Sequence, residues 1–334
     1  MNMNSPEPLI DSFGRVHRDL RISVTDRCNI RCRYCMPHED VRFKPRSELL
    51  TFEEIEQFVR VVAGLGVTKL RITGGEPLLR AQLPKLIAAL AGIPGIADIA
   101  MTTNGLLLAE HARDLRQAGL QRLNVSLDAL DGEAFRQITR RDGVQRVLNG
   151  IAAARDAGFE NIRLNAVAIR GITESQIVPL ARFAREQGLE LRFIEFMPLD
   201  ADQNWRDGQV LSGAEVRSRL EDAFGPLVPA ARTISSQPAV DYCFPDGSGQ
   251  VGFINAVTVP FCEQCNRLRL TAEGQMRHCL FSTEEWDARA VLRGGHDEEL
   301  AALVRACVGA KKAARGNDQP VFVRPQRAMF QIGG

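Results

Sequence analysis

Three cysteines within eight residues constrain this chain more than any other feature of its sequence. They are Cys28, Cys32 and Cys35, spaced C-x3-C-x2-C, with the aromatic residue Tyr34 directly before the third. Soft thiolates at such loop spacing are what an iron–sulfur cluster requires. Three protein ligands on a [4Fe-4S] cluster leave one iron open, where a small molecule can chelate and receive an electron. The alternatives are a zinc site or buried free thiols, but zinc prefers four protein ligands and His38 is not a convincing fourth.

A second set of three cysteines lies towards the other end of the chain. Its members are spaced C-x2-C-x13-C: Cys262, Cys265 and Cys279. We predict a second [4Fe-4S] cluster with one open iron here. The alternative is a structural zinc site completed by His278. The run Arg267-Leu268-Arg269 follows closely, and guanidiniums beside an open metal site suit a ligand that carries both a donor atom and phosphates.

Composition narrows the class of protein. The 334 residues are 45% apolar and 25% charged, and 42 Lys and Arg against 41 Asp and Glu leave a net charge of +1. This near-neutral balance produces no overall electrostatic field that would attract nucleic acid or a membrane surface. No apolar run approaches the ~20 residues of a membrane span, and the first residues do not resemble a signal peptide. Eight cysteines without an export signal therefore favour a cytoplasmic location and metal binding over disulfides. Cys243 and Cys307 have no partners at ligand spacing and are interpreted as buried or free thiols.

Strands and helices alternate along most of the first two thirds of the chain. Residues 19–25 alternate apolar and polar side chains, as a strand does, and deliver the first cysteine loop. Thr51 and Glu54 form a capping-box pattern that begins a helix, which Gly64 and Gly66 close. Further strands are predicted over 69–73, 97–102, 121–127, 161–168 and 190–197, and further helices over 81–91, 107–118, 143–157 and 174–187. About six such units predict an α/β fold, a partial (β/α)6 TIM-type barrel with parallel strands and right-handed crossovers.

The chain divides into three predicted regions. They are an N-terminal segment, the barrel, and a C-terminal extension that carries the second iron–sulfur site: 1–17, 18–197 and 198–334. Residues 198–260 are rich in Pro, Gly and Ser with short strand-like runs such as Val251–Asn255, which indicates an irregular extension. Helices return near 212–223 and 297–308, and the chain ends in Gly333-Gly334.

The predicted strands have one apolar and one polar face. The apolar side chains, which we expect to pack on the helices, include Leu20, Ile22, Leu70, Ile72, Leu123, Val125, Ile162 and Leu164. The opposite set is Arg21, Ser23, Arg71, Thr73, Asn124, Ser126, Arg163 and Asn165. A barrel interior is ordinarily packed with branched aliphatic residues, so this polar face predicts a wet chamber for a polar, anionic ligand. The inverse orientation, with the polar face in solvent, would leave the helices nothing apolar to pack on.

These motifs together resemble a known family. C-x3-C-x-aromatic-C is similar to the signature of the radical S-adenosylmethionine (SAM) superfamily. From about Gly14 to Gly334 the chain resembles the GTP 3′,8-cyclases, the family of molybdenum cofactor biosynthesis protein A. The motifs that carry the likeness are Arg18-Asp-Leu-Arg21, Ser23-Val-Thr-Asp-Arg-Cys28, Arg71-Ile-Thr-Gly-Gly-Glu-Pro77, Thr102-Thr-Asn-Gly105, Asn124-Val-Ser-Leu-Asp128, Arg192-Phe-Ile-Glu-Phe-Met197 and the terminal Gly-Gly.

The resemblance implies roles for the matching residues. Around SAM it implies Tyr34, Gly75, Ser126 and Met197. Around GTP it implies Arg21, Arg71, Thr102, Arg163, Arg267, Leu268 and Arg269. The first [4Fe-4S] cluster, which binds SAM, would be held by Cys28, Cys32 and Cys35, and the second, which binds the substrate's guanine, by Cys262, Cys265 and Cys279. Arg163 stands where relatives often have lysine, which changes the geometry of the cation. The Gly-Gly tail would reach into the active site.

The resemblance also implies the reaction and its partners. An electron from a low-potential donor cleaves SAM, and the resulting 5′-deoxyadenosyl radical takes hydrogen from ribose C3′ of GTP. The C3′ radical adds to guanine C8, and reduction gives (8S)-3′,8-cyclo-7,8-dihydroguanosine 5′-triphosphate. A downstream cyclic pyranopterin monophosphate synthase would consume this product. We expect a monomer or homodimer with no membrane or nucleic-acid partner.

Two rival functions are compatible with parts of the sequence. One is a radical SAM enzyme that modifies peptides and carries an auxiliary cluster, although such enzymes usually have a longer Cys-rich C-terminal region. The other is a zinc-dependent nucleic-acid-binding module, which would predict a basic face interleaved with aromatic residues. The net charge of +1 and an aromatic content of 6% argue against the second rival.

Overall fold

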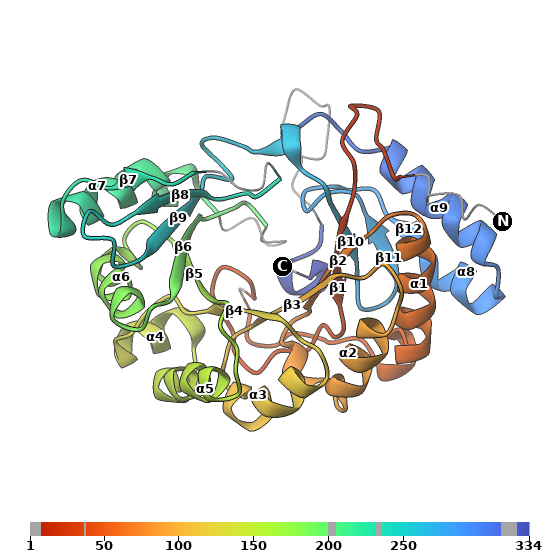
Figure 1. Cartoon of the computed structure of the whole chain (residues 1–334), viewed down its shortest axis with the longest axis horizontal. Coiled ribbons are helices and arrows are strands. Elements are labelled where there is room, and N and C mark those ends of the chain that lie inside the picture. The colour runs from red at the N-terminus through yellow and green to blue at the C-terminus, as the bar shows by residue number, and fades with distance from the viewer. Residues whose placement is uncertain (1–7, 37, 200–204, 232–235, 315–325, 334) are drawn as a thin grey trace.

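The computed structural model describes residues 8–36, 38–199, 205–231, 236–314 and 326–333. Within them a single curved sheet of twelve strands runs in the order β12-β11-β10-β1-β2-β3-β4-β5-β6-β9-β8-β7 (Figure 1). The strands are β1 Asp19–Ser23, β2 Lys69–Thr73, β3 Asp98–Thr103, β4 Arg122–Ser126, β5 Ile162–Ala168, β6 Glu190–Glu195, β7 Val228–Pro229, β8 Val240–Cys243, β9 Gln250–Ile254, β10 Arg267–Leu270, β11 Gln275–Arg277 and β12 Trp286–Asp287. Each of the strands from β1 to β6 pairs in parallel with the next, as the β/α alternation predicts.

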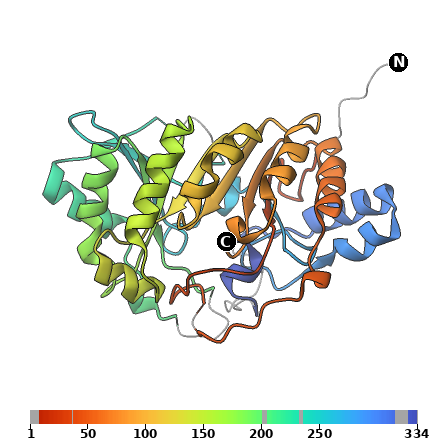
Figure 2. The ribbon, with the colours of Figure 1, turned by 90° about the horizontal axis from the view of Figure 1, so that it is seen from below.

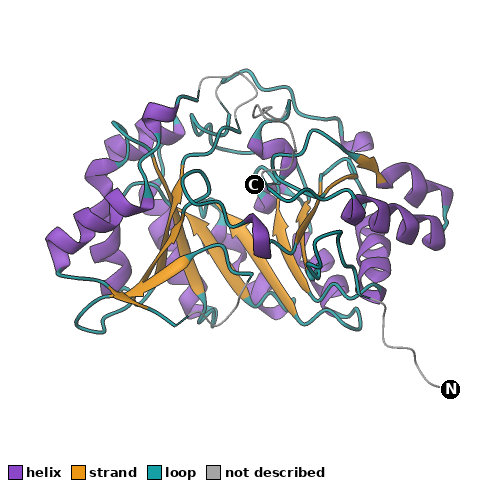
Figure 3. Ribbon diagram, turned by 90° about the horizontal axis from the view of Figure 1, so that it is seen from above, coloured by secondary structure: helices purple, strands orange, loops and turns teal. Residues whose placement is uncertain are grey.

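The described residues form ten α-helices, and all but the last lie on the outer face or at the sides of this sheet. They are α1 Phe52–Gly64, α2 Leu83–Ala91, α3 Leu108–Gln117, α4 Gly132–Thr139, α5 Val144–Asp156, α6 Ile177–Glu186, α7 Gly213–Phe224, α8 Ala288–Gly294, α9 Asp297–Gly309 and α10 Met329–Ile332. Seen from below, the helices of the β/α units stand side by side in front of the strands (Figure 2). Seen from above, the inner face of the sheet is visible with helices behind it and at its sides (Figure 3). The short, dark blue α10 lies inside the curve (Figure 1).

The polar and apolar faces of the strands point as the sequence predicts. Leu20 and Ile22 on β1 are fully buried and belong to the same apolar cluster as Phe58, Val59 and Val62 of α1. Helix α1 begins at the predicted capping box, because the Thr51 hydroxyl accepts from the Glu54 N–H while the Glu54 carboxylate accepts from the Thr51 N–H. The apolar core therefore lies between sheet and helices, and the arginine-bearing face is turned to the inside of the curve.

The second half of the chain contributes strands to both edges of the barrel. Strand β9 pairs in parallel with β6, and β10 pairs in parallel with β1 on the opposite edge. The parallel part of the sheet thus has eight strands, two more than the β/α repeat alone predicts, and the antiparallel pairs β8–β7 and β11–β12 extend it. The stretch read as an irregular extension contains β7, β8 and β9, because short strands without regular spacing leave little periodicity in the sequence.

Several local predictions need correction or addition. The strand predicted over 19–25 ends at Ser23, and helix α4 was not predicted. The helices expected near 212–223 and 297–308 are present as α7 and α9. No helix in the described part of the chain has the length and apolar character needed to cross a bilayer.

Candidate active site

The first cysteine loop follows β1 directly and is clamped by the glycines after β2. The Gly75 N–H donates to Thr25 O (2.7 Å) and the Glu76 N–H to Arg27 O (2.7 Å). A Cβ at Gly74 would collide with the Thr25 carbonyl, and one at Gly75 with the carbonyls of Asp26 and Arg27. Glycine is required at both positions because two backbones approach this closely. The Gly-Gly-Glu-Pro motif therefore fixes the course of the loop that carries the first three thiols.

The first three thiols are enclosed and protonated in the metal-free protein. Burial raises the pKa of Cys28 to about 11 and that of Cys35 to about 12, and the charge of Cys28 adds to the shift at Cys35. Burial also raises the pKa of Cys32, with Asp128 and the other two thiols contributing. Iron binding at this loop must therefore displace protons. All eight cysteines of the chain are free thiols, so Cys28, Cys32 and Cys35 are available as the three protein ligands of a cluster.

Glu76 and Asn104 support this loop from the neighbouring strands. Glu76 is fully buried and accepts from the Thr103 hydroxyl (2.8 Å) and the Asn104 N–H (2.7 Å). The Asn104 amide donates to Asn29 Oδ1 (2.7 Å) and lies 3.8 Å from Cys28 Sγ. Burial raises the pKa of Glu76 to about 7 despite these donors. The quoted motifs contain both residues, but sequence reasoning assigned neither a supporting role.

The four residues expected around SAM lie at or beyond the carboxyl ends of β1, β2, β4 and β6. The Tyr34 hydroxyl donates to Asp128 Oδ2 (2.7 Å), and Asp128 Oδ1 accepts from the Val167 N–H (2.8 Å). Burial raises the pKa of Asp128 to about 6. Ser126 is the last residue of β4, and Met197 follows β6 by two residues. Parallel strands place such ends together at one edge of a sheet, where ligands of α/β folds bind.

A row of arginines crosses the inner face where β10, β1 and β2 pair. Arg21 is the register partner of Arg269 on one side and of Arg71 on the other. Burial and the charges of the neighbouring arginines lower the pKa of Arg21. Burial also lowers the pKa of Arg71 to about 10 and that of Arg269 to about 9. The Nε atoms of Arg21, Arg71 and Arg267 are buried and have no hydrogen-bond partner. This excess of enclosed positive charge suits a polyanion.

The neighbours of three residues predicted around GTP determine how each could contact a ligand. Arg163 donates from Nε to Glu190 (2.5 Å), and the same carboxylate binds Arg192 (2.6 Å), so the charge of Arg163 is partly balanced within the protein. Thr102 is the register partner of Asn124 on the inner face. Leu268 alternates with its arginine neighbours, and its side chain is fully buried in the apolar core. Only the backbone of Leu268 could therefore meet a ligand in the chamber.

The second set of thiols gathers at the opposite end of the same strands. Cys265 precedes β10, and because β11 runs antiparallel to β10, the chain returns to the same end before Cys279. Burial alone would raise the pKa of Cys265, but the charges of Arg267 and Lys311 outweigh it and lower the pKa to about 6. Burial raises the pKa of Cys279. The buried Lys311 places Nζ 3.7 Å from Cys265 Sγ.

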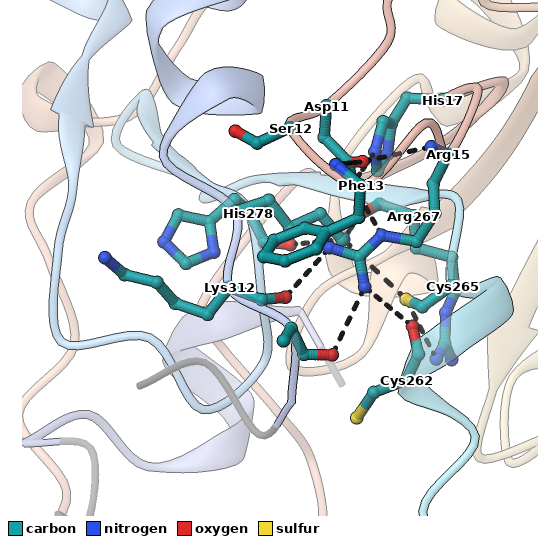
Figure 4. Close-up of polar contacts among 12 residues, drawn as sticks. Asp11, Ser12, Phe13, Arg15, His17, Cys262, Cys265, Arg267, His278 and Lys312 are labelled. Atoms are coloured by element: carbon teal, nitrogen blue, oxygen red, sulfur yellow. Dashed lines mark hydrogen bonds and ion pairs between the residues drawn. The ribbon is translucent and has the colours of Figure 1, made fainter. Parts of the chain in front are cut away.

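His278 does not supply a fourth ligand to these thiols. Its Nε2 lies 3.2 Å from Ser282 Oγ and 3.4 Å from Glu284 Oε2, and its ring packs beside Trp286. Figure 4 shows the imidazole directed away from Cys262 and Cys265. Among the described residues, no three His, Cys, Asp or Glu side chains are grouped to hold a single metal ion.

The C-terminal residues lie between the arginine row and the first thiol loop. Arg269 Nη1 donates to Gly333 O (2.6 Å), and a Cβ at Gly333 would lie 3.0 Å from Ser23 Cβ. Phe330 packs against Met36, and its backbone N–H hydrogen-bonds the Cys35 thiol. The expected placement of the tail in the site is therefore seen for Gly333, whereas Gly334 lies outside the described residues.

Comparison with sequence families and curated proteins gives consistent matches. The Radical SAM superfamily matches residues 22–184, and Molybdenum Cofactor Synthesis C matches residues 189–316. The chain is 54% identical to a GTP 3′,8-cyclase of Rhodopirellula baltica over 100% of this chain and 94% of that protein. It is 46% identical to a GTP 3′,8-cyclase of Pelotomaculum thermopropionicum (97% of this chain, 99% of that protein) and 45% identical to one of Streptomyces coelicolor (98% and 96%).

Solved structures with a similar fold are more distant in sequence. A histidine-tagged anSMEcpe with bound AdoMet aligns over 93% of this chain and 90% of that chain, with a TM-score of 0.61 at 14% identity. Streptococcus suis SuiB bound to S-adenosylmethionine aligns over 87% of this chain and 69% of that chain, with a TM-score of 0.60 at 16% identity. At this level of identity the likeness concerns the fold alone.

Proposed function

The chain belongs to the GTP 3′,8-cyclase family of the radical SAM superfamily, and from this premise we propose how its residues carry the family's reaction. The reaction converts GTP to (8S)-3′,8-cyclo-7,8-dihydroguanosine 5′-triphosphate, the first step of molybdenum cofactor biosynthesis. One observation supports the proposal most strongly: the two thiol sets lie at opposite ends of the paired strands β1 and β10, with the arginine row between them.

The separation of the two thiol sets suits one elongated ligand. Cys28 follows the carboxyl end of β1, whereas Cys265 precedes the amino end of β10. A strand of five residues spans roughly 16 Å, so a molecule must be extended to meet both ends. We propose that GTP lies along the inner face with its guanine at the second set. Arg21, Arg71 and Arg269 would hold its phosphates as charge-assisted donors.

Each thiol set is proposed to hold a [4Fe-4S] cluster with one open iron. When bound, the first cluster supplies the electron that cleaves SAM, and the second offers an open iron to a guanine nitrogen or the exocyclic amine. We propose that the chain orients SAM through contacts with Tyr34, Gly75, Ser126 and Met197. Further polar contacts to GTP would come from the side chains of Thr102, Arg163 and Arg267 and from the backbone of Leu268. The tail at Gly333 and the surrounding strands would exclude water from the reacting centre.

The second cluster is supported by the chemistry of its donors. The three free thiols on irregular segments are brought to one end of β10 by the sheet, and the low pKa of Cys265 provides a thiolate, the form that binds iron. His278, the candidate fourth ligand of a zinc site, is directed elsewhere. Iron, rather than zinc, is therefore our proposal for this site.

The test is anaerobic incubation of the iron-loaded protein with reductant, SAM and GTP, followed by identification of the nucleotide product by mass spectrometry. We expect the cyclised dihydro-nucleotide together with 5′-deoxyadenosine. A Cys32→Ser protein should yield neither, because oxygen is a poor cluster ligand. Absence of the cyclised product from the wild-type protein, with SAM cleaved only when a peptide is added, would favour the peptide-modifying alternative instead.

Other expectations from the sequence stay predictions. They concern a low-potential electron donor, a downstream cyclic pyranopterin monophosphate synthase, a monomeric or homodimeric state and a cytoplasmic location.

A further inference from the structure

The residues before β1 form a tight turn that is anchored to the body of the protein. The His17 N–H donates to Leu9 O (2.8 Å), and the Leu9 N–H to Leu65 O (3.3 Å) just after α1. Inside the turn the fully buried carboxylate of Asp11 accepts from the Arg15 Nε (2.6 Å) and lies 3.0 Å from His17 Nε2. Its second oxygen accepts from the Arg15 N–H (3.0 Å). The Asp11 carboxylate therefore binds Arg15 through both its side chain and its backbone.

Arg15 reaches from this turn to two distant segments of the C-terminal half. Its Nη1 donates to Cys262 O (2.8 Å), and its Nη2 donates to Lys312 O (2.8 Å). Nη1 also lies 3.4 Å from Ala313 O. Figure 4 shows the guanidinium between the cysteine turn and the segment after α9, with Asp11 above it in this view. The side chain is almost fully buried, so these charge-assisted bonds are shielded from water.

The segment that Arg15 holds also contacts the other two cysteine stretches. Lys311 Nζ donates to Arg267 O (3.0 Å) and to His278 O (2.8 Å), next to Cys279, and lies 3.7 Å from Cys265 Sγ. The 3₁₀ turn at Cys262–Gln264 is held internally by the Cys265 N–H donating to Cys262 O (3.1 Å). Cys262 O therefore accepts two bonds, one from its own turn and one from Arg15.

We propose that Arg15, oriented by Asp11, is a positioning residue of the second cluster that keeps the three thiol-bearing segments at their mutual spacing. The inference rests on the proposed second cluster. None of the three cysteines lies within a strand or an α-helix. The 3₁₀ turn fixes only the spacing of Cys262 and Cys265, so the distance from this pair to Cys279 depends on contacts between segments. The residue acts on carbonyl groups and touches no thiol, which distinguishes it from a ligand. Groups outside the ligand shell commonly change metal affinity by about 10–100-fold when they are removed.

The test isolates the second cluster in the full chain. A background with Cys28, Cys32 and Cys35 all changed to Ala removes the first set of ligands, and anaerobic reconstitution should then leave about four iron per chain. In this background, the release of iron to a chelator is timed for Arg15→Gln. The matched control is Arg136→Gln, which removes an exposed guanidinium of α4 that pairs with Glu133 and Asp142. The electron paramagnetic resonance spectrum of the reduced cluster gives a second readout, independent of activity.

We expect Arg15→Gln to release iron at least about tenfold faster than Arg136→Gln. Arg15→Lys should behave like Arg15→Gln, because a single ammonium cannot reach Asp11, Cys262 and Lys312 together. Asp11→Asn should also accelerate iron release, by a smaller factor. If Arg15→Gln does not fold, the rate of iron release from Asp11→Asn tests the positioning role instead.

The outcomes separate the two proposals. If the background protein binds no iron, the proposed second cluster fails. If it binds about four iron and both Arg15→Gln and Asp11→Asn release it at the control rate, the positioning role alone is overturned. In the chain that keeps all six proposed cluster ligands, an equal acceleration of iron loss from both clusters would also overturn it, since that would indicate general destabilisation.

Discussion

At the scale of single residues, the two thiol sets differ in charge before any metal binds. Cys265 has its pKa lowered to about 6 because Arg267 and Lys311 outweigh burial, whereas burial raises the pKa of Cys279 and of the first-loop cysteines. At neutral pH Cys265 is therefore already a thiolate, whereas the cysteines of the first loop are thiols. Iron loading of the first site should be the more dependent on high pH.

This difference predicts selective alkylation of Cys265. In iron-free protein treated briefly with iodoacetamide at pH 7, Cys265 should react faster than Cys279, because the thiolate is the nucleophile. At pH 5, which is below the pKa of Cys265, the thiol should be protonated and its labelling suppressed. Peptide mass spectrometry measures both sites in one sample. Equal rates for the two residues at both pH values would contradict the electrostatic argument.

Gly333 is the residue at which the tail meets the site. Its φ of +77° disfavours any other residue, and an added Cβ would lie only 3.0 Å from Ser23 Cβ and 3.1 Å from Thr73 Cγ2, so a side chain there would be strained. We expect Gly333→Ala to displace the tail from Arg269, lowering GTP cyclisation by about tenfold or more while iron content stays unchanged, since a ~1.4 kcal/mol rise in the barrier is sufficient for that loss. The measurement is cyclised product per 5′-deoxyadenosine formed. Gly309→Ala, where the added Cβ would meet nothing within 4 Å, is the control, and wild-type coupling in Gly333→Ala would refute a role for the tail.

At the scale of elements, the pairing of β10 with β1 determines how much positive charge the chamber holds. The pairing aligns Arg269 with Arg21, and β2 adds Arg71 on the other side. Like charges so close destabilise one another unless an anion enters, and burial strengthens the repulsion because the local dielectric is low. The row is therefore poised for a ligand with several negative charges, as GTP has.

The arginine row predicts a selective loss of GTP affinity. Arg21→Ala and Arg71→Ala each remove a charge-assisted contact worth on the order of 1.5–3 kcal/mol, so the Kd for GTP should rise by about tenfold to hundredfold. SAM binding should change little. Equilibrium binding of each ligand to the reconstituted protein measures this, with the exposed Arg146→Ala as control. Equal losses of GTP and SAM affinity would mean that these arginines hold the sheet together.

At the scale of the whole molecule, the C-terminal half completes the site of the N-terminal half. It supplies β10 with its arginines, the second thiol set and the tail that reaches the first thiol loop. Glu195 helps to join the halves at the other edge, since it accepts from the N–H groups of Val257 and Thr258 (2.8 Å each) at the end of β6. We therefore expect substrate chemistry to depend on both halves and SAM cleavage to depend chiefly on the first.

This division predicts that the two activities separate in Cys279→Ser. We expect iron to fall from about eight to about four per chain. Some SAM cleavage without substrate turnover should persist, and no cyclised nucleotide should form. Iron analysis together with product analysis of the same sample measures all three. Zinc in the wild-type site, or full cyclisation by the variant, would rule out the substrate-binding cluster.

Local sequence patterns were sufficient to predict much of the fold and of the candidate site. Period-two strands and a capping box at Thr51 and Glu54 predict the β/α units, because propensity and periodicity are properties of neighbouring residues. Strand parity likewise predicts that Arg21, Arg71 and Arg163 share the inner face, and the cysteine spacings select the donor chemistry.

Only the tertiary structure decides which distant segments meet. Strand β10 joins β1 across more than two hundred residues, Lys311 reaches Cys265, and Arg15 binds the carbonyl of Cys262. A lone arginine in a polar turn and a lysine after a helix carry no pattern that distinguishes them from solvated surface charges. Their roles arise from burial and from partners brought together by packing, which no local sequence pattern encodes.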